Sequence, residues 1–212
     1  MSVPTESGTV FIVDDDASFL RSVSRLLQAA GYAVKAFESA TKFLEELRPE
    51  MRGCVLADLQ MPGMNGLELQ AALGEAANPL PVIFLSAQGN IPTTVQAMRR
   101  GAEDFLTKLS PKEELLDAVK RALARDVAQR NQRERLNALR GRFEALTRRE
   151  LEVLEHVVRG EQNKQIAADL GINLRTVKLH RTNLTRRLQV QSVAELTRLV
   201  EEAGLFKSDK AE

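Results

Sequence analysis

Clustered carboxylates are the feature of this sequence with the clearest chemical potential. Asp58 follows a short apolar run, residues 54–57, and precedes a stretch rich in Pro, Gly and Asn that is typical of a loop. A second apolar run, residues 9–13, ends in three consecutive acids, Asp14, Asp15 and Asp16. A single acid in such a place usually caps the next helix, but neighbouring carboxylates raise one another's pKa unless a cation lies between them. Because Mg²⁺ prefers oxygen ligands, we expect a Mg²⁺-dependent phosphoryl site built on Asp58.

Other polar residues that end strand patterns could complete this site. Asp58 would be the nucleophile that forms an acyl phosphate. Ser86 and Lys108 would donate hydrogen bonds to the phosphoryl oxygens, because positioning and charge neutralisation carry most of this chemistry. The expected metal ligands are Asp14, Asp15, Asp58 and the backbone carbonyl of Gln60. The alternatives are a helix cap at Asp16, a solvated Asp14, a Ser86 that only ends its strand and a surface Lys108.

The elements that must position these residues alternate between strand and helix patterns. Strands are expected at 9–13, 33–37, 53–57, 81–86 and 103–107, and helices at 17–30, 39–47, 66–73, 91–100 and from 111 onward. Five such units predict an α/β domain with a five-stranded parallel sheet, doubly wound as in flavodoxin and covered by helices on both faces. Ligands bind at the carboxyl ends of the strands in such folds, where the polar residues above fall. Three acids after the first strand argue against a flavin or nucleotide site, which needs a Gly- and Ser-rich loop there.

This half of the chain resembles the receiver domain of two-component response regulators. The resemblance covers residues 8–125 and rests on four motifs in the expected order, Val13-Asp14-Asp15-Asp16, Ala57 to Gly63, Ser86-Ala87 and Thr107-Lys108. It implies that a sensor histidine kinase transfers a phosphoryl group to Asp58. It also implies a switch in which Ser86 moves toward the phosphoryl group and Phe105 turns inward, whereas the alternative for Phe105 is a static core aromatic.

The sequence departs from the receiver pattern at one position beside the site. Receivers usually have a proline after the lysine, with a cis peptide bond that aims the lysine, but Leu109 follows Lys108 here. A cis bond before a residue other than proline costs about 3–4 kcal/mol. We therefore expect a trans bond, a different loop path and a Lys108 that holds the phosphoryl oxygens less well.

Composition and charge separate the two halves of the chain. Residues 1–125 contain 13 Lys and Arg against 16 Asp and Glu, and residues 126–212 contain 17 against 13. The single Cys54 lies in a predicted buried strand, which indicates a reducing compartment. Neither a signal peptide nor a membrane-spanning apolar run is visible, so we expect a cytoplasmic protein with no membrane partner. A basic segment at 163–187 indicates nucleic-acid binding.

The second half has the pattern of four short helices with a glycine turn between the middle pair, which is typical of a helix-turn-helix. Capping residues are expected at Thr147, Asn163, Asn173 and Ser192. On a helical wheel for 174–188, Val177, Leu184 and Leu188 define the core face. The opposite face holds Arg175, Leu179, Thr182 and Arg186, with Lys178 at its flank. Neither His156 nor His180 has a ligand cluster in the sequence, so no metal or catalytic role is expected for them.

These residues resemble the LuxR-type helix-turn-helix over 146–206. The matching motifs are Leu146 to Glu150, Gly160, Asn163 to Ala167, Thr176 to His180 and Leu188 to Val190. With a receiver in front, they place the chain in the FixJ/NarL branch of response regulators. The resemblance implies base contacts by Lys178, Leu179 and Thr182, a phosphate contact by Lys164, and dimerisation through the last helix. Arg175 and Arg186 complete the expected DNA-binding set.

We expect a receiver at 1–125, a helical linker at 126–145 and a DNA-binding domain at 146–212. A coiled-coil contact through 136–146 is an open alternative. The predicted function is a phosphorylation-dependent transcriptional regulator that is not an enzyme. Its expected partners are a sensor histidine kinase, promoter DNA and a second copy of the chain, with RNA polymerase as a further candidate. One alternative is a receiver that acts without phosphate as an interaction module. The other is a Mg²⁺-dependent phosphohydrolase, which would need an acid where Gln60 stands.

Overall fold

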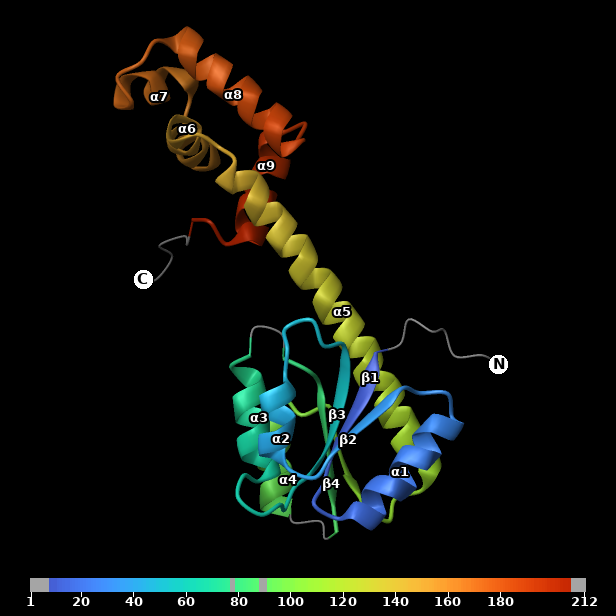
Figure 1. Cartoon of the computed structure of the whole chain (residues 1–212). Coiled ribbons are helices and arrows are strands. Elements are labelled where there is room, and N and C mark those ends of the chain that lie inside the picture. The colour runs from blue at the N-terminus through green and yellow to red at the C-terminus, as the bar shows by residue number, and fades with distance from the viewer. Residues whose placement is uncertain (1–7, 77–78, 88–90, 207–212) are drawn as a thin grey trace. The chain divides into compact units, whose positions relative to one another are not determined.

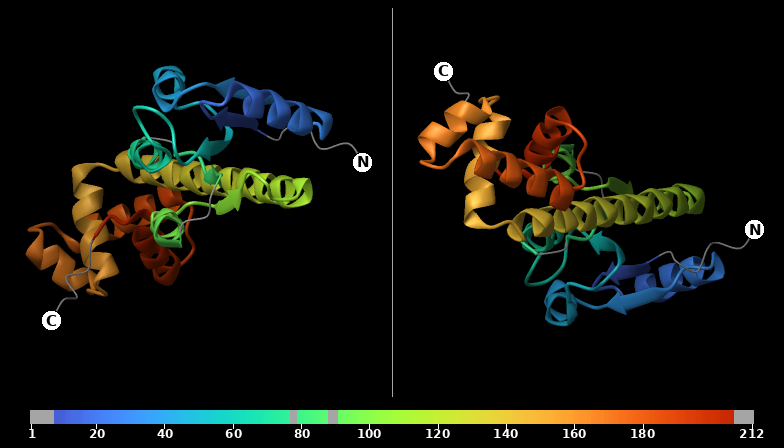
Figure 2. Two further views of the ribbon diagram at one scale, coloured as in Figure 1. Left: turned by 90° about the horizontal axis from the view of Figure 1, so that it is seen from below. Right: turned by 90° about the horizontal axis from the view of Figure 1, so that it is seen from above.

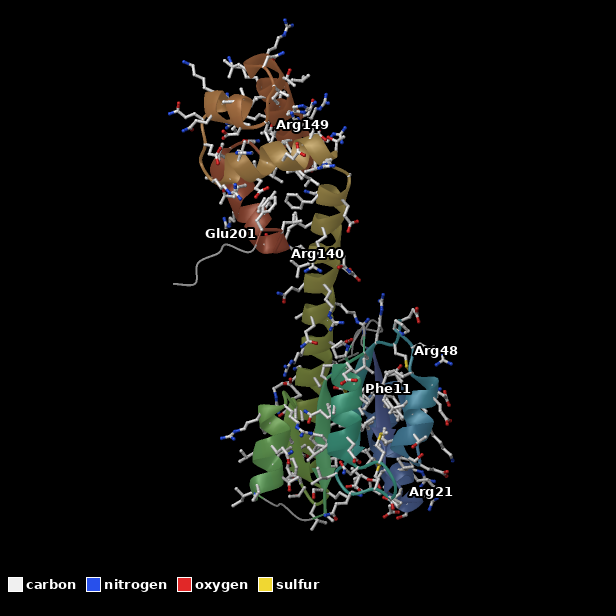
Figure 3. All side chains as sticks on the ribbon, turned by 90° about the vertical axis from the view of Figure 1, so that its left-hand side faces the viewer. Phe11, Arg21, Arg48, Arg140, Arg149 and Glu201 are labelled. Atoms are coloured by element: carbon white, nitrogen blue, oxygen red, sulfur yellow. The ribbon has the colours of Figure 1, made fainter. Side chains whose placement is uncertain are left out.

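The structure is a computed structural model that describes residues 8–76, 79–87 and 91–206 (Figure 1). The chain divides into two compact units, Met1–Gln129 and Arg130–Glu212. In Figure 3 the labelled Phe11 lies inside the first unit, whereas Arg21 and Arg48 extend outward from it. Among the described residues, no helix combines the length and apolar character needed to cross a membrane.

The first unit is built on a five-stranded parallel sheet, as the sequence predicts. The strands are β1 (Thr9–Val13), β2 (Val34–Phe37), β3 (Gly53–Asp58), β4 (Val82–Ser86) and β5 (Asp104–Thr107), in the spatial order β2-β1-β3-β4-β5. The three central strands are almost fully buried, which explains their unbroken apolar runs in the sequence. Because all strands are parallel, their carboxyl ends lie at one edge of the sheet.

Helices cover both faces of this sheet (Figure 1). On one face, α2 (Ala40–Glu46), α3 (Gly66–Gly74) and α4 (Ile91–Arg99) enclose a core that includes Phe43, Phe84 and Leu69. On the other face, α1 (Ala17–Ala29) and the first part of α5 (Lys112–Glu144) enclose a core that includes Ile12 and Leu27. The result is the doubly wound arrangement expected for a receiver, with loops free to gather at the carboxyl edge.

Helix α5 runs without a break through both views of Figure 2. Its residue Asp126 is buried in the first unit and accepts a hydrogen bond from the backbone N–H of Gly53 at 3.0 Å. Its residues Leu139 and Phe143 are buried in the core of the second unit. The apolar stripe at 136–146 therefore packs within the chain, and Phe143 is not available for the coiled-coil contact that the sequence left open.

The second unit contains α6 (Arg148–Val158), α7 (Asn163–Asp169), α8 (Leu174–Leu188) and α9 (Val193–Ala203) around one apolar core. Thr147, Asn173 and Ser192 cap α6, α8 and α9 through their side chains, as predicted. The prediction of a cap at Asn163 is wrong. The cap position of α7 belongs to Gln162, and Asn163 is the first helical residue. The Asn163 side chain accepts a hydrogen bond from Arg181.

Candidate functional site

Three carboxylates meet at the carboxyl edge of the sheet. Asp14 follows β1, Asp58 is the last residue of β3, and one carboxylate oxygen from each of Asp14, Asp15 and Asp58 lies within 4.8 Å of the others. Asp14 is 1% exposed and Asp58 is 7% exposed, whereas Asp15 is open to solvent. The parallel strand pair β1 and β3 is therefore the element that brings the two acidic segments together, as the sequence predicted.

Lys108 enters this cluster from the end of β5. Its Nζ donates a hydrogen bond to Asp58 Oδ2 at 2.9 Å and forms an ion pair with Asp14 Oδ2 at 2.6 Å. The Lys108–Leu109 peptide bond is trans, as predicted. With this trans bond Lys108 still contacts both carboxylates. The expectation that it holds the phosphoryl oxygens less well stays a prediction.

The electrostatics of the site favour a bound cation. Burial raises the pKa of Asp14 above its ordinary value, and the contact with Lys108 offsets only part of this effect. Burial alone would lower the pKa of Lys108, but its contacts with Asp14 and Asp58 outweigh burial and raise it. Among the described residues, the buried Asp14 Oδ2 accepts no hydrogen bond of normal geometry, although Lys108 lies beside it. An oxygen-rich cluster with such an atom fits Mg²⁺.

The loop residues around the cluster have separate structural roles. Asp16 caps α1 by accepting hydrogen bonds from the backbone N–H groups of Ser18 and Phe19, so it is the helix cap that the sequence offered as an alternative. These bonds, with that from the Ser18 hydroxyl, lower the pKa of Asp16. The backbone N–H of Gln60 donates to Asp58 Oδ1 at 3.2 Å, which orients the carboxylate from its own loop.

Ser86 and Phe105 lie on the neighbouring strands. Ser86 ends β4 in a buried position, and its backbone carbonyl accepts a hydrogen bond from Lys108 N–H at 2.8 Å. Phe105 in β5 is half-buried, with its ring centroid 6.3 Å from that of Phe84. Ser86 therefore ends the strand next to β3, and Phe105 lies beside Phe84 on the following strand. The switch between them stays a prediction.

Gly66 allows the start of α3 to lie close against the end of β3. A Cβ atom at this position would lie 2.5 Å from the carbonyl oxygen of Asp58 and 2.9 Å from the Phe84 ring. The Gly66 N–H also donates to the Leu59 carbonyl at 3.0 Å. The sequence predicted a loop after Asp58 and a helix from residue 66, and the close approach of α3 to β3 explains why a glycine stands at this junction.

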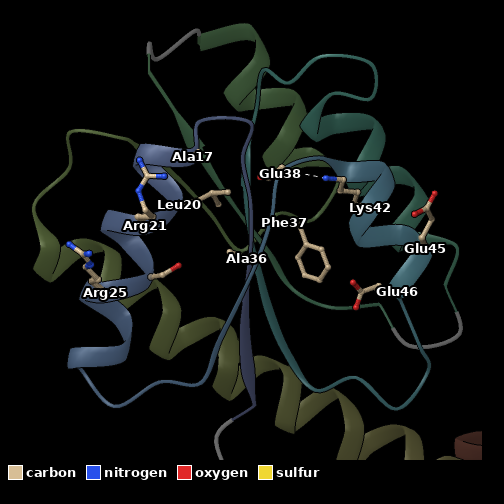
Figure 4. A pocket seen from close by; sticks show the side chains of 11 residues that line it. Ala17, Leu20, Arg21, Arg25, Ala36, Phe37, Glu38, Lys42, Glu45 and Glu46 are labelled. Carbon is tan, nitrogen blue, oxygen red and sulfur yellow. Dashed lines mark hydrogen bonds and ion pairs between the residues drawn. The ribbon is translucent and has the colours of Figure 1, made fainter.

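A separate groove lies between α1 and α2 (Figure 4). It has a volume of about 590 Å³ and is lined by charged residues of both signs, among them Arg21, Arg25, Lys42 and Glu46. The ion pair between Lys42 and Glu38 at its rim is drawn as a dashed line. None of the predicted phosphoryl-site residues lines this groove, so it is distinct from the acidic cluster.

Helix α8 in the second unit presents the predicted DNA-binding face. Val177, Leu184 and Leu188 are buried as the helical wheel predicted. Leu179 is 58% exposed, as its place on the outer face of the helical wheel predicted. The predicted contact residues Lys164, Arg175, Lys178, Leu179, Thr182 and Arg186 are all exposed.

Some basic residues of the segment 163–187 have internal partners instead. Arg181 donates a 2.7 Å hydrogen bond to Asn163, which joins α8 to α7. Arg187 donates to the Ala145 carbonyl at 2.8 Å and lies 3.4 Å from the buried Glu150. These two arginines therefore also connect α8 to α7, to Ala145 and to the start of α6.

His156 has acidic neighbours that the sequence did not reveal. Its Nδ1 lies 2.6 Å from Glu161 Oε2 and 4.0 Å from Asp169 Oδ2. The expectation that no ligand cluster accompanies either histidine is wrong for His156, because Glu161 in the following loop and Asp169 at the end of α7 both lie near its ring.

Comparisons with known proteins agree with both units. Residues 10–120 match the family model of the response regulator receiver domain, and residues 144–200 match that of the bacterial regulatory proteins of the luxR family. The chain is 40% identical over 195 residues to response regulator protein TodT of Pseudomonas putida, covering 92% of this chain and 86% of TodT. It is 38% identical to transcriptional regulatory protein FixJ of Azorhizobium caulinodans, covering 97% of this chain and 98% of FixJ.

Two solved structures are also similar. Response regulator StyR matches with a TM-score of 0.79 and 45% identity, covering 92% of this chain and 98% of StyR. Full-length FixJ from B. japonicum matches with a TM-score of 0.58 and 32% identity, covering 96% of this chain and 100% of FixJ. The chain belongs to the FixJ/TodT-type response regulators and is a phosphorylation-dependent DNA-binding regulator, with a receiver domain followed by a LuxR-type helix-turn-helix domain.

Proposed function

We propose that Asp58 is the phosphoacceptor of this regulator. The observation that carries the proposal is the meeting of Asp14, Asp15, Asp58 and Lys108 at the carboxyl edge of the sheet, with Ser86 at the end of the adjacent strand. A carboxylate oxygen of Asp58 attacks the phosphorus of the donor, and the bond from phosphorus to the donor's leaving group breaks. The product is an acyl phosphate on Asp58.

The neighbouring residues stabilise the charge that develops on the transferred group. Lys108, which already contacts Asp58 Oδ2, donates to one phosphoryl oxygen, and the Ser86 hydroxyl donates to another. Asp14, Asp15, Asp58 and the Gln60 carbonyl would hold Mg²⁺. When bound, this ion neutralises phosphoryl charge next to the acids that would otherwise repel it. Ser86 and Phe105 then rearrange and carry the signal to the rest of the receiver.

A sensor histidine kinase is the physiological donor, and the response occurs in the cytoplasm, where promoter DNA is accessible. The phosphorylated chain binds DNA as a homodimer, with α9 as the dimerising helix. Lys178, Leu179 and Thr182 face bases, whereas Lys164, Arg175 and Arg186 contribute positive charge to the phosphate backbone. RNA polymerase is the further partner through which transcription would change. The chain's only covalent chemistry is its own phosphorylation and dephosphorylation.

Incubation with acetyl phosphate and Mg²⁺ tests the acceptor directly. Wild-type protein should gain one phosphoryl group that is stable to acid and labile to base. Intact-mass spectrometry measures the gain. Asp58→Asn should gain none, while Asp117→Asn, an exposed acid on α5, should behave as wild type. Absence of an adduct in wild type would favour a phosphate-independent interaction module. Release of many equivalents of phosphate would favour the phosphohydrolase.

A further inference from the structure

Lys108 needs more than its backbone position to reach the two carboxylates. Its N–H is held by the Ser86 carbonyl at 2.8 Å, which places the Cα atom at the end of β5. The four-carbon stem beyond it has many rotamers, so ordering this side chain costs conformational entropy. The next residue, Leu109, is 90% exposed and offers no wall for the stem.

The wall is provided by Phe19 in the first turn of α1. The Nζ atom of Lys108 lies over the Phe19 ring, 4.5 Å from its centroid, which is within the range of a cation–π interaction. The Lys108 side chain is only 17% exposed, so the ammonium group is largely shielded from water at this contact. Attraction between a cation and a ring is stronger when the cation is desolvated.

Phe19 is itself held in place by the helix cap described above. Asp16 accepts a hydrogen bond from the Phe19 N–H at 3.2 Å, and the ring packs against the core between α1, α5 and the sheet. The third acid of the Asp14-Asp15-Asp16 triplet therefore acts on the site indirectly. It fixes the first turn of α1, and that turn presents the ring to Lys108.

We infer that Phe19 is a positioning residue for phosphoryl transfer, which holds the Lys108 ammonium group toward Asp58 through the face of its ring. The inference rests on the proposed role of Asp58 and Lys108. The alternative is that Phe19 only fills apolar space, in which case its volume would matter and the charge distribution of its ring would not.

Ring fluorination separates these two readings because it weakens the negative face of the ring with little change in volume. Phe19 is replaced in the full chain by 4-fluoro-, 3,5-difluoro- and 3,4,5-trifluorophenylalanine, and the rate of phosphorylation by acetyl phosphate is measured. The rate should fall stepwise with each added fluorine. The same series at Phe43, a fully buried aromatic on the opposite face of the sheet, is the control and should show no trend.

Replacement of Phe19 by standard amino acids extends the test. Phe19→Leu should slow phosphorylation by about tenfold, within the roughly 2- to 30-fold range that cation–π strengths allow, whereas Phe19→Tyr should restore the wild-type rate. Thermal unfolding of each variant shows whether the receiver remains folded.

The position of Lys108 can also be observed without phosphorylation. In ¹³C-labelled protein, the Lys108 CεH₂ signal is assigned by its loss in Lys108→Met. The ring current of Phe19 should shift this signal upfield. The shift should disappear in Phe19→Leu and return in Phe19→Tyr. A flat fluorine series, or Phe19→Leu at the wild-type rate, would overturn the inference. If wild type forms no adduct at all, the proposed acceptor fails, and the ring-current shift alone then decides whether Phe19 holds Lys108.

Discussion

Replacement of Asp14 by Asn should make the receiver more stable while removing its response to Mg²⁺. Asp14 is 1% exposed, and burial raises its pKa, so the ionised form is unfavourable in the folded state. The Asn side chain keeps an oxygen to accept the 2.9 Å hydrogen bond from Asp16 N–H. Lys108 loses one partner but keeps Asp58 at 2.9 Å, so no charge is left alone. Residues placed for function rather than stability commonly show this behaviour.

The sign of the pH dependence follows from the raised pKa. The folded receiver binds a proton at Asp14 more tightly than the unfolded chain, whose Asp14 titrates near its ordinary value of 3.8. The free-energy cost of ionising the buried Asp14 is therefore absent below pH 3.8, grows as the pH rises toward the pKa of the folded state, and is complete above that pKa. At pH 7 we expect Asp14→Asn to gain about 1–2 kcal/mol, which is about 4–8 °C in the melting temperature of a unit of this size.

Calorimetry of the full chain in Mg²⁺-free buffer measures this difference between pH 4 and pH 7. The receiver transition is identified in wild type as the one that moves upward when Mg²⁺ is added, because a ligand of the folded state stabilises it. The same transition in Asp14→Asn should start higher at pH 7, respond little to Mg²⁺, and approach wild type as the pH falls toward 4. A variant less stable than wild type at pH 7, or a difference that grows on acidification, would refute this account of Asp14.

Three other outcomes are expected. Lys178→Ala should change which operator sequence is preferred. Lys164→Ala should weaken binding to all sequences alike and reduce its salt dependence by about one counterion. Binding titrations at several salt concentrations measure both effects. Gly66→Ala should cost about 1–3 kcal/mol of receiver stability in urea unfolding and slow phosphorylation, because the added methyl group overlaps the backbone of the acidic strand. Asp126→Ala should destabilise the receiver by about 1–3 kcal/mol, because it leaves the first N–H of β3 buried without its acceptor, and Asp126→Asn should recover part of the loss.

Much of the fold and of the acidic site could be predicted from local sequence. Unbroken apolar runs identified the buried strands of a parallel sheet, and the acids that end them fell at one edge because parallel strands share their carboxyl ends. Thr147, Asn173 and Ser192 were recognised as caps because a cap acts within three residues of itself. The wheel of α8 likewise separated Val177 from Leu179, since helical periodicity is a local property.

Most of the features that were missed depend on residues far apart in the chain. Asn163 has the residue type of a cap, but its side chain is taken by Arg181, which follows it by 18 positions. The sequence shows Arg187 only as one of several basic residues, and its hydrogen bond to the Ala145 carbonyl is visible only in the structure. His156 lies beside Glu161, five positions further on, but only the fold brings Asp169 of α7 to within 4.0 Å of it. Side-chain pairing of this kind leaves no periodic signal in the sequence.

The sequence by itself therefore determined the order of the elements, the acidic strand ends and the exposed face of α8, because propensity, periodicity and capping act over a few residues. The tertiary structure decided which charges face each other. Lys108 lies 50 positions from Asp58 in the chain, and a trans bond before Leu109 made its aim uncertain from sequence. Packing of α1 against the sheet places the Phe19 ring beside it, and this long-range contact is what gives the ammonium group a defined position at the acidic cluster.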